Sequence, residues 1–221
     1  MDDRAGVIFD MDGVLIDSYA AHYASWQAAG RELGFAMTHE QFVASFGRTS
    51  RENIAEFWPD LATSDAAIAR IDDRKESHFR AILERQFPAM DGAVELIDAL
   101  AAAGFALAVG SSGPPENVAL TLDGLGRRQR FAAVITARDV TRGKPDPQVF
   151  LLAAERLGLP PRRCVVIEDA PAGIAAAKAA GMKCIGLAST GRTPPELAAA
   201  DLVVNSLRDI SAEKVRMLLG G

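Results

Sequence analysis

The sequence is poor in cysteine, has no excess of basic residues and lacks any apolar run near the length of a membrane helix. Its two cysteines, Cys164 and Cys184, lie in apolar runs typical of buried strands, which favours free thiols in a reducing cytosol over a disulfide. A net charge of −5 and a pI of about 5.3 indicate no surface for nucleic acid or anionic lipid. The acidic N-terminus is unlike a signal peptide. We therefore expect a cytoplasmic protein that binds neither nucleic acid nor membrane.

With 221 residues, 49% hydrophobic and 24% charged, the chain is long enough for one α/β domain and a modest inserted module. Six short apolar runs are typical of buried strands, and helical patterns lie between most of them. This alternation predicts a doubly wound, Rossmann-like parallel sheet covered on both faces. The expected strands are 7–9, 105–109, 131–135, 164–167, 183–187 and 202–204; the expected helices are 93–103, 115–125, 147–157 and 173–180.

Residues 18–90 differ from the rest of the chain because they contain no convincing strand. Their apolar residues recur at helical spacing, as at Phe42 and Phe46. We expect an all-helical cap domain here, inserted into an α/β core formed by residues 1–17 and 91–221. An insertion at this point should lie above the carboxyl ends of the strands, where open α/β sheets bind ligands.

Polar residues follow the predicted strands at the points where the strands end. These residues are Asp10, Asp12, Ser111, Ser112, Lys144, Glu168 and Asp169. Because the carboxyl ends of parallel strands meet at one edge, four carboxylates, two hydroxyls and one ammonium are expected to converge. A single aspartate after a strand is more often a turn former or a helix cap. The occurrence of the whole set at successive strand ends favours a functional site.

The chemistry of this set favours phosphoryl transfer. Converging carboxylates repel one another unless a cation lies among them, and an all-oxygen site is the preference of Mg²⁺. Hydroxyls, turn amides and a lysine can donate hydrogen bonds to an anion. A site that holds both a hard cation and a bound phosphate suits phosphoryl transfer.

The same residues resemble the motifs of the haloacid dehalogenase superfamily. The segment 10–18 resembles its first motif, Ser111 its second, Lys144 its third, and Glu168 with Asp169 its fourth. Order and spacing agree over essentially the full length. A helical cap between the first two motifs is similar to that of the subgroup containing β-phosphoglucomutase, phosphoglycolate phosphatase and sugar-phosphate phosphatases.

The resemblance implies a role for each motif residue. Asp10 would attack phosphorus and form an aspartyl-phosphate, and Asp12 would protonate the leaving oxygen and then activate water. Ser111 and Lys144 would hold the phosphoryl oxygens. The second aspartate disfavours the dehalogenase branch, whose members lack an acid at that position.

The resemblance also implies the metal ligands. Asp169 would bind Mg²⁺ directly, Glu168 directly or through another ligand, and Asp12 through its backbone carbonyl. Asp10 would complete the set. Ser112 and Gly113 would join the substrate-binding residues of the second motif.

Four cap residues are candidates for substrate binding: His22, Arg48, Arg51 and Lys75. Alignment with β-phosphoglucomutase places His22 on a cap histidine linked to the acid/base aspartate, and Lys75 on a lysine that contacts substrate. The loop at 47–51 has one residue more than that enzyme's basic loop, so either arginine could be the equivalent. Each candidate has a plainer alternative as a surface residue, part of a helix N-terminal turn or part of a solvated ion pair.

From these observations we expect a Mg²⁺-dependent phosphatase that hydrolyses a small phosphorylated metabolite, of the sugar phosphate or phosphoglycolate type, through an aspartyl-phosphate. A phosphosugar mutase resembling β-phosphoglucomutase is the alternative, because sequence does not reveal how the aspartyl-phosphate is resolved. A non-catalytic binding module of receiver type is a remote third, since such domains are near half this length and lack a helical insertion. A monomer is expected, because the cap alone would cover the cleft.

Overall fold

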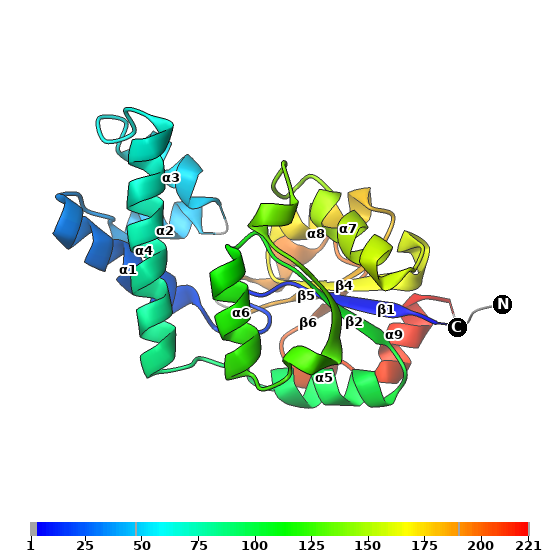
Figure 1. The fold of residues 1–221 in the computed structure, drawn as a ribbon. Helices are drawn as coiled ribbons and strands as arrows, with labels where there is room; N and C mark the ends of the chain where they lie inside the picture. Colours follow the sequence, from blue (N-terminus) through cyan, green and yellow to red (C-terminus); the bar gives the residue numbers. More distant parts are fainter. Residues whose placement is uncertain (1–3, 47, 190, 221) are drawn as a thin grey trace. The chain divides into compact units, whose positions relative to one another are not determined.

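A computed structural model describes residues 4–46, 48–189 and 191–220 (Figure 1). The chain divides into two compact units. The core unit comprises Met1–Asp17 and Ala89–Gly221, and the helical unit comprises Ser18–Pro88. Each unit is described by itself below.

The second boundary between the units lies two residues before the position predicted from sequence, which was after residue 90. Backbone pairing explains the difference. Ile16 and Ala89 form an antiparallel bridge, and the Met90 N–H donates a hydrogen bond to the Leu15 carbonyl at 3.0 Å. The chain therefore rejoins the core unit at Ala89, through contacts that apolar periodicity does not reveal.

The core unit contains a six-stranded sheet in which every pair of neighbouring strands is parallel. The strand order is β3-β2-β1-β4-β5-β6, so the order reverses direction at β1, where open α/β sheets bind ligands. The predicted fold class is confirmed. The strands are β1 (Gly6–Phe9), β2 (Ala106–Gly110), β3 (Phe131–Ile135), β4 (Cys164–Glu168), β5 (Lys183–Leu187) and β6 (Leu202–Val204).

Helices cover both faces of this sheet, with α7 and α8 on one face and α5 and α9 on the other (Figure 1). The apolar stripe of α7 packs on the strands, and Phe150 in its first turn is fully buried in the same cluster as Ile8 and Ala108. The helices of the core unit are α5 (Ala93–Ala102), α6 (Pro115–Gly124), α7 (Gln148–Leu157), α8 (Pro171–Ala179) and α9 (Ala212–Leu218).

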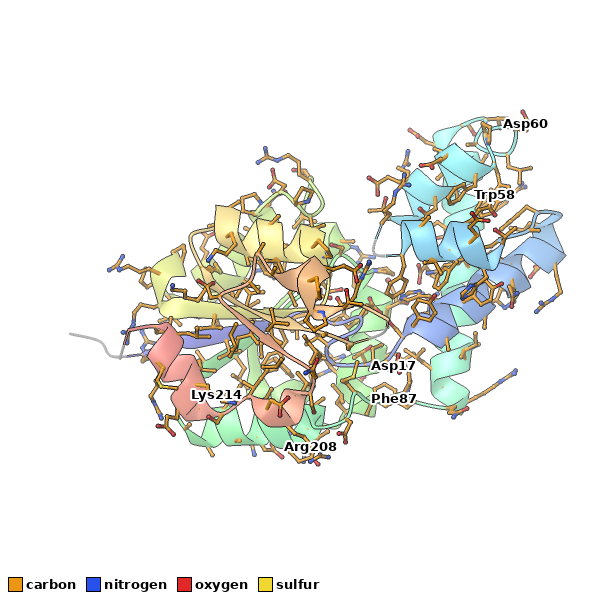
Figure 2. All side chains as sticks on the ribbon, turned by 180° about the vertical axis from the view of Figure 1, so that it is seen from behind. Asp17, Trp58, Asp60, Phe87, Arg208 and Lys214 are labelled. Carbon is orange, nitrogen blue, oxygen red and sulfur yellow. The ribbon has the colours of Figure 1, made fainter. Side chains whose placement is uncertain are left out.

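The helical unit consists of α1 (Tyr19–Leu33), α2 (His39–Ser45), α3 (Ser50–Phe57) and α4 (Asp65–Arg85), and its described residues contain no strand. Capping boxes start α2 at Thr38 and α3 at Thr49, each with the side chain three residues later returning a hydrogen bond. The buried centre of the unit includes Trp26, against which Trp58 packs with ring centroids 5.5 Å apart. Trp58 is labelled in Figure 2. The all-helical prediction for this stretch is therefore confirmed for the residues described.

Both cysteines of the core unit are free and buried. Burial raises the pKa of the Cys164 thiol to about 11 and raises that of Cys184 further. Both thiols therefore stay protonated near neutral pH, and the protonated form is a poor nucleophile. None of the helices in the described part of the chain combines the length and the apolar character that crossing a bilayer requires.

Candidate active site

The carboxyl ends of β1 and β4 lie next to each other and bring three acidic residues together. Phe9 is in register with Ile167, and the Asp10 N–H extends the ladder by donating to the Ile167 carbonyl at 3.0 Å. Glu168 is the last residue of β4, and Asp169 follows it. Neighbouring parallel strands thus place three carboxylates at one edge of the sheet, as the sequence predicted.

Lys144 joins two of these carboxylates. Its Nζ lies 2.6 Å from Asp10 Oδ1 and 2.7 Å from Glu168 Oε1. All three side chains are largely buried, with 11%, 10% and 1% of their surface exposed respectively. The ammonium also lies 4.9 Å from the centre of the Phe150 ring. A charged lysine is retained here because two carboxylates offset the cost of burying it.

Three carboxylates in this group have the spacing of a metal site. One oxygen each from Asp10, Glu168 and Asp169 lie within 4.8 Å of one another, and all three residues are buried. One ammonium does not balance three carboxylates, so the group has room for a further positive charge. Hard, buried carboxylate oxygens fit a divalent cation such as Mg²⁺.

Two glycines make room for the carboxylates of this site. A Cβ on Gly173 would lie 1.7 Å from Glu168 Oε1, and one on Gly13 would lie 2.1 Å from Asp169 Oδ2. Gly13 also has a φ of +76°, which disfavours any residue with a side chain. Glu168 is held further by the Ala170 N–H, which donates to Oε2 at 2.7 Å. Close backbone approach therefore fixes both carboxylates where a cation would need them.

The electrostatics of the site raise the proton affinity of Asp10. Burial raises its pKa to about 7; Lys144 opposes this effect, while Glu168 and Asp12 add to it. Burial also opposes the charge of Lys144, but Asp10 and Glu168 prevail and raise the pKa of its ammonium. A cation beside Asp10 would favour the ionised carboxylate, which is the nucleophilic form.

The loop after β2 presents a buried hydroxyl. The Ser111 N–H donates to the Ile135 carbonyl at 3.0 Å, and Ser111 Oγ accepts the Gly113 N–H at 2.9 Å. A serine hydroxyl that accepts one bond still has its own proton to donate. Ser112 is exposed, and Gly113 is half-buried just before α6 begins. Ser111 is thus placed as a donor, whereas the Gly113 amide is already engaged.

A serine that the sequence did not indicate supports the turn containing Asp12. Ser189 follows β5, and its Oγ donates a hydrogen bond to the Gly13 carbonyl at 2.6 Å. The Gly13 N–H donates to the Ile16 carbonyl at 2.9 Å, which closes the same turn. Nothing in the local sequence around Ser189 signals this contact, since it joins two loops that only the β1–β4–β5 order brings together.

In the helical unit, two of the four predicted substrate-binding residues meet. Lys75 Nζ lies 2.8 Å from His22 Nδ1, across α4 and α1. The same ammonium lies 2.7 Å from Oε1 of Glu76, a residue that the sequence analysis did not single out. Glu76 follows Lys75 on a helix rich in charged residues, where the pattern alone suggests a solvated face. Lys75 and Glu76 are both buried, and the sequence pattern does not reveal this burial.

The two candidate arginines occupy ion pairs within the helical unit. Arg48 Nη2 lies 2.6 Å from Glu56 Oε2, and Arg51 Nη1 lies 2.7 Å from Asp65 Oδ1. Their side chains are 38% and 57% exposed. Gly47, which precedes Arg48 in the same loop, lies outside the described residues. Both arginines therefore have an acidic partner in the structure. Their contacts with substrate remain a prediction.

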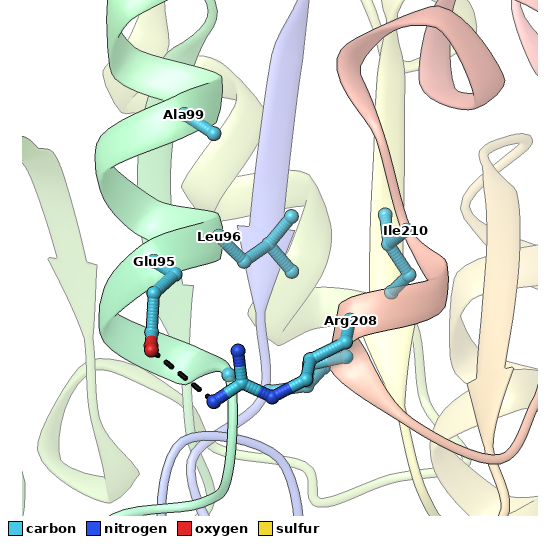
Figure 3. Close-up of a pocket in the computed structure, with 7 residues that line it drawn as sticks. Glu95, Leu96, Ala99, Arg208 and Ile210 are labelled. Carbon is cyan, nitrogen blue, oxygen red and sulfur yellow. Dashed lines mark hydrogen bonds and ion pairs between the residues drawn. The ribbon is translucent and has the colours of Figure 1, made fainter.

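A separate pocket of about 210 Å³ lies between α5 and the short helix η5 (Leu207–Asp209) (Figure 3). Its polar feature is an ion pair in which Arg208 Nη2 lies 3.2 Å from Glu95 Oε1. No residue of the predicted site lines it. The lining residues are Gly92, Glu95, Leu96, Ala99, Leu207, Arg208 and Ile210.

Comparison with known proteins agrees with the motifs. Residues 5–181 match the family model of haloacid dehalogenase-like hydrolases. Hexitol phosphatase A from Escherichia coli (strain K12) is 36% identical over 95% of this chain and 94% of that protein. Validoxylamine A 7'-phosphate phosphatase from Streptomyces hygroscopicus subsp. limoneus is 33% identical, over 92% and 94% respectively.

Solved structures show the same similarity. The crystal structure of β-phosphoglucomutase from Clostridium difficile matches with a TM-score of 0.87 and 25% sequence identity. The match covers 98% of this chain and 97% of that one. With the family model spanning most of the sequence and the four motifs gathered at one sheet edge, the chain belongs to the haloacid dehalogenase-like hydrolases.

Proposed function

We propose that this protein is a Mg²⁺-dependent phosphatase that hydrolyses a small phosphorylated metabolite through an aspartyl-phosphate on Asp10. The observation that carries the proposal is the buried group of Asp10, Lys144, Glu168 and Asp169, which combines a nucleophile, a fixed ammonium and a cation-binding set of oxygens. The names of the two phosphatase relatives support a substrate of the sugar phosphate or polyol phosphate kind.

In the first half of the proposed reaction, an Asp10 carboxylate oxygen attacks phosphorus and the bond to the substrate oxygen breaks. Asp12 gives its proton to that leaving oxygen. Lys144, bonded to Asp10 Oδ1, holds the carboxylate in place and offsets its charge as the phosphate approaches. The Ser111 hydroxyl donates to a phosphoryl oxygen, and Ser112 and Gly113 border the same oxygens.

In the second half, Asp12 takes a proton from water, whose oxygen attacks phosphorus and displaces the Asp10 carboxylate. Inorganic phosphate leaves, and both aspartates return to their starting states. Asp10, Asp169, Glu168 and the Asp12 carbonyl would hold the metal ion. When bound, Mg²⁺ supplies positive charge that offsets the charge on the phosphoryl group.

The substrate part beyond the phosphate is proposed to be selected by His22, Lys75 and one of Arg48 and Arg51. A phosphosugar mutase is the second candidate, favoured by the match to the β-phosphoglucomutase structure.

We further propose that the protein acts as a monomer in the cytoplasm. Its two buried free thiols support a reducing compartment.

The decisive experiment is phosphate release from a panel of phosphorylated metabolites in the presence of Mg²⁺, with and without chelator. The panel contains hexitol, hexose and pentose phosphates, phosphoglycolate, nucleotides and β-glucose 1-phosphate. We expect release from one or a few compounds, reversible silencing by chelator and no release by Asp10→Asn. Activity that persists in excess chelator would refute the metal requirement. Conversion of β-glucose 1-phosphate to glucose 6-phosphate without phosphate release would establish the mutase.

A further inference from the structure

A tight turn follows β1 and carries Asp12 and Gly13. The amides of residues 14–16 all donate to the Met11 carbonyl, at 2.8 to 3.3 Å. The Gly13 N–H donates in turn to the Ile16 carbonyl at 2.9 Å. These hydrogen bonds are local, so they fix the shape of the turn but not its position relative to β4 and β5. That position depends on contacts from outside the turn.

Ser189 makes such a contact from the loop after β5. Its Oγ donates to the Gly13 carbonyl at 2.6 Å. The backbone on either side of this hydroxyl is anchored as well. The Ala188 N–H donates to the Val204 carbonyl of β6 at 2.8 Å, and the Arg192 N–H donates to the Ser189 carbonyl at 2.9 Å. The hydroxyl therefore ties the turn after β1 to the β5–β6 side of the sheet.

The same turn lies against the Asp169 carboxylate. A Cβ on Gly13 would be 2.1 Å from Asp169 Oδ2, so the Gly13 backbone and this carboxylate are closely packed. A shift of the turn would therefore change the spacing between the Asp12 carbonyl and the Asp169 carboxylate. This spacing is critical for Mg²⁺, which demands near-ideal octahedral geometry with oxygen ligands at about 2.0–2.1 Å.

We propose that Ser189 is a positioning residue of the metal site, whose hydroxyl holds the turn at residues 11–16 so that Asp12 and Asp169 keep the spacing that a divalent cation requires. The inference rests on the proposed Mg²⁺-dependent function. Ser189 acts through the Gly13 carbonyl and does not itself bind the metal ion. Its loss leaves every metal ligand in the chain but loosens their arrangement, so the first effect is on metal affinity.

The test is isothermal titration calorimetry of Mg²⁺ alone into the metal-free, full-length protein, which needs no enzymatic activity. In Ser189→Ala we expect the Kd for Mg²⁺ to rise about tenfold, the usual order for the loss of a group that orients a metal ligand. Ser189→Thr keeps a hydroxyl donor and should stay within about twofold of the wild type.

Ser211→Ala is the matched control. Its Oγ accepts the Lys214 N–H at 3.2 Å at the start of α9, a helix that contains no residue of the predicted site. Each alanine variant loses one hydrogen bond, so both should lower the Tm by about 2–4 °C. Only Ser189→Ala should raise the Kd, which separates positioning of the metal ligands from a general loss of stability.

An unchanged Kd in Ser189→Ala would overturn the proposal, as would an equal rise in Ser211→Ala. If Ser189→Ala does not fold, Ser189→Cys decides, because a thiol is only a weak donor and should also raise the Kd. A wild type that binds no Mg²⁺ would refute the metal requirement and this inference with it. Phosphate release that needs Mg²⁺, together with equal Kd values in the wild type and Ser189→Ala, would refute the role of Ser189 alone.

Discussion

Each unit of the protein buries a lysine, and the two lysines have different surroundings. In the core unit, Lys144 contacts two carboxylates, Asp10 and Glu168, and a third from Asp169 lies within 4.8 Å of both. In the helical unit, Lys75 contacts the Glu76 carboxylate and the His22 imidazole and lies near two aromatic rings. Negative charge is therefore in excess around the first lysine and much closer to balance around the second.

This difference separates two kinds of site. An excess of carboxylates remains costly until a cation joins them, so the core cluster is arranged to gain charge on binding. The Lys75 ammonium lies against one carboxylate and one imidazole of its own unit, so its charge is already largely offset there. We therefore expect changes in the core cluster to affect the reaction most, and changes in the helical unit to affect substrate preference.

The largest effect is expected for Asp10→Asn. The amide is a poor nucleophile, so kcat should fall by a factor on the order of 10⁴ or more, to the limit of detection. Phosphate release on the best substrate measures the loss, and circular dichroism checks that the fold is intact. Substantial turnover in this variant would show that another residue is the nucleophile.

The second prediction concerns the pH dependence of stability without metal. Burial raises the pKa of Asp10 from 3.8 to about 7, so the folded protein holds a proton there that the unfolded chain releases. The stabilisation is fully present below about pH 4 and is lost as pH rises towards about 7, which costs on the order of a few kcal/mol. In chelator, urea unfolding should show Asp10→Asn gaining stability over the wild type as pH rises from about 4 to about 7, with little further change above about pH 7. A stability difference that is constant over this pH range would contradict the raised pKa of Asp10.

A smaller effect is expected from substitution of Gly173, which packs against the Glu168 carboxylate. Gly173→Ala would place a methyl group 1.7 Å from Glu168 Oε1, so we expect a loss of about 1–3 kcal/mol in unfolding free energy and a marked fall in kcat. Gly143→Ala is the matched control, because nothing lies within 4 Å of its Cβ position, and its stability should change by less than about 0.5 kcal/mol. Equal stability of the two variants would mean that Glu168 can move away without cost.

The smallest effect is expected at the exposed ion pairs of the helical unit. Removing Arg48 or Arg51 by alanine substitution should change the unfolding free energy by less than about 0.5 kcal/mol, because their pairs with Glu56 and Asp65 are solvent-exposed. A rise in KM in one variant alone would then identify the arginine that binds substrate. If KM is unchanged in both, neither predicted contact exists.

Most strands of the core unit and the motif residues at their carboxyl ends could be predicted from the sequence. The strands at 131–135, 183–187 and 202–204 have the predicted bounds. β1 and β4 differ by one residue at one end, and β2 is shifted by one residue at both ends. In any parallel sheet the carboxyl ends of the strands lie at the same end, and β1 and β4 are neighbours, so Asp10 and Glu168 come together. Local pattern was therefore sufficient for the motif residues.

Other features depend on contacts that no local pattern encodes. The charges of Lys75 and Glu76 suggest an exposed helix face, yet packing of α1 against α4 buries both. Ser189 reaches the Gly13 carbonyl only because β5 lies beside β4. The strand order and the pairing of Ile16 with Ala89 likewise require the assembled fold.

Because of the bridge between Ile16 and Ala89, we expect that the helical unit can be replaced by another domain without disturbing the core unit. The chain leaves the core unit after Asp17 and returns just beyond Phe87, both labelled in Figure 2, and the core residues on either side of the insertion are already paired. A short turn could close that pair, because an antiparallel bridge needs only a hairpin connection. Chimeras could thus carry one catalytic centre and a series of different selectivity modules, joined at the same two splice points.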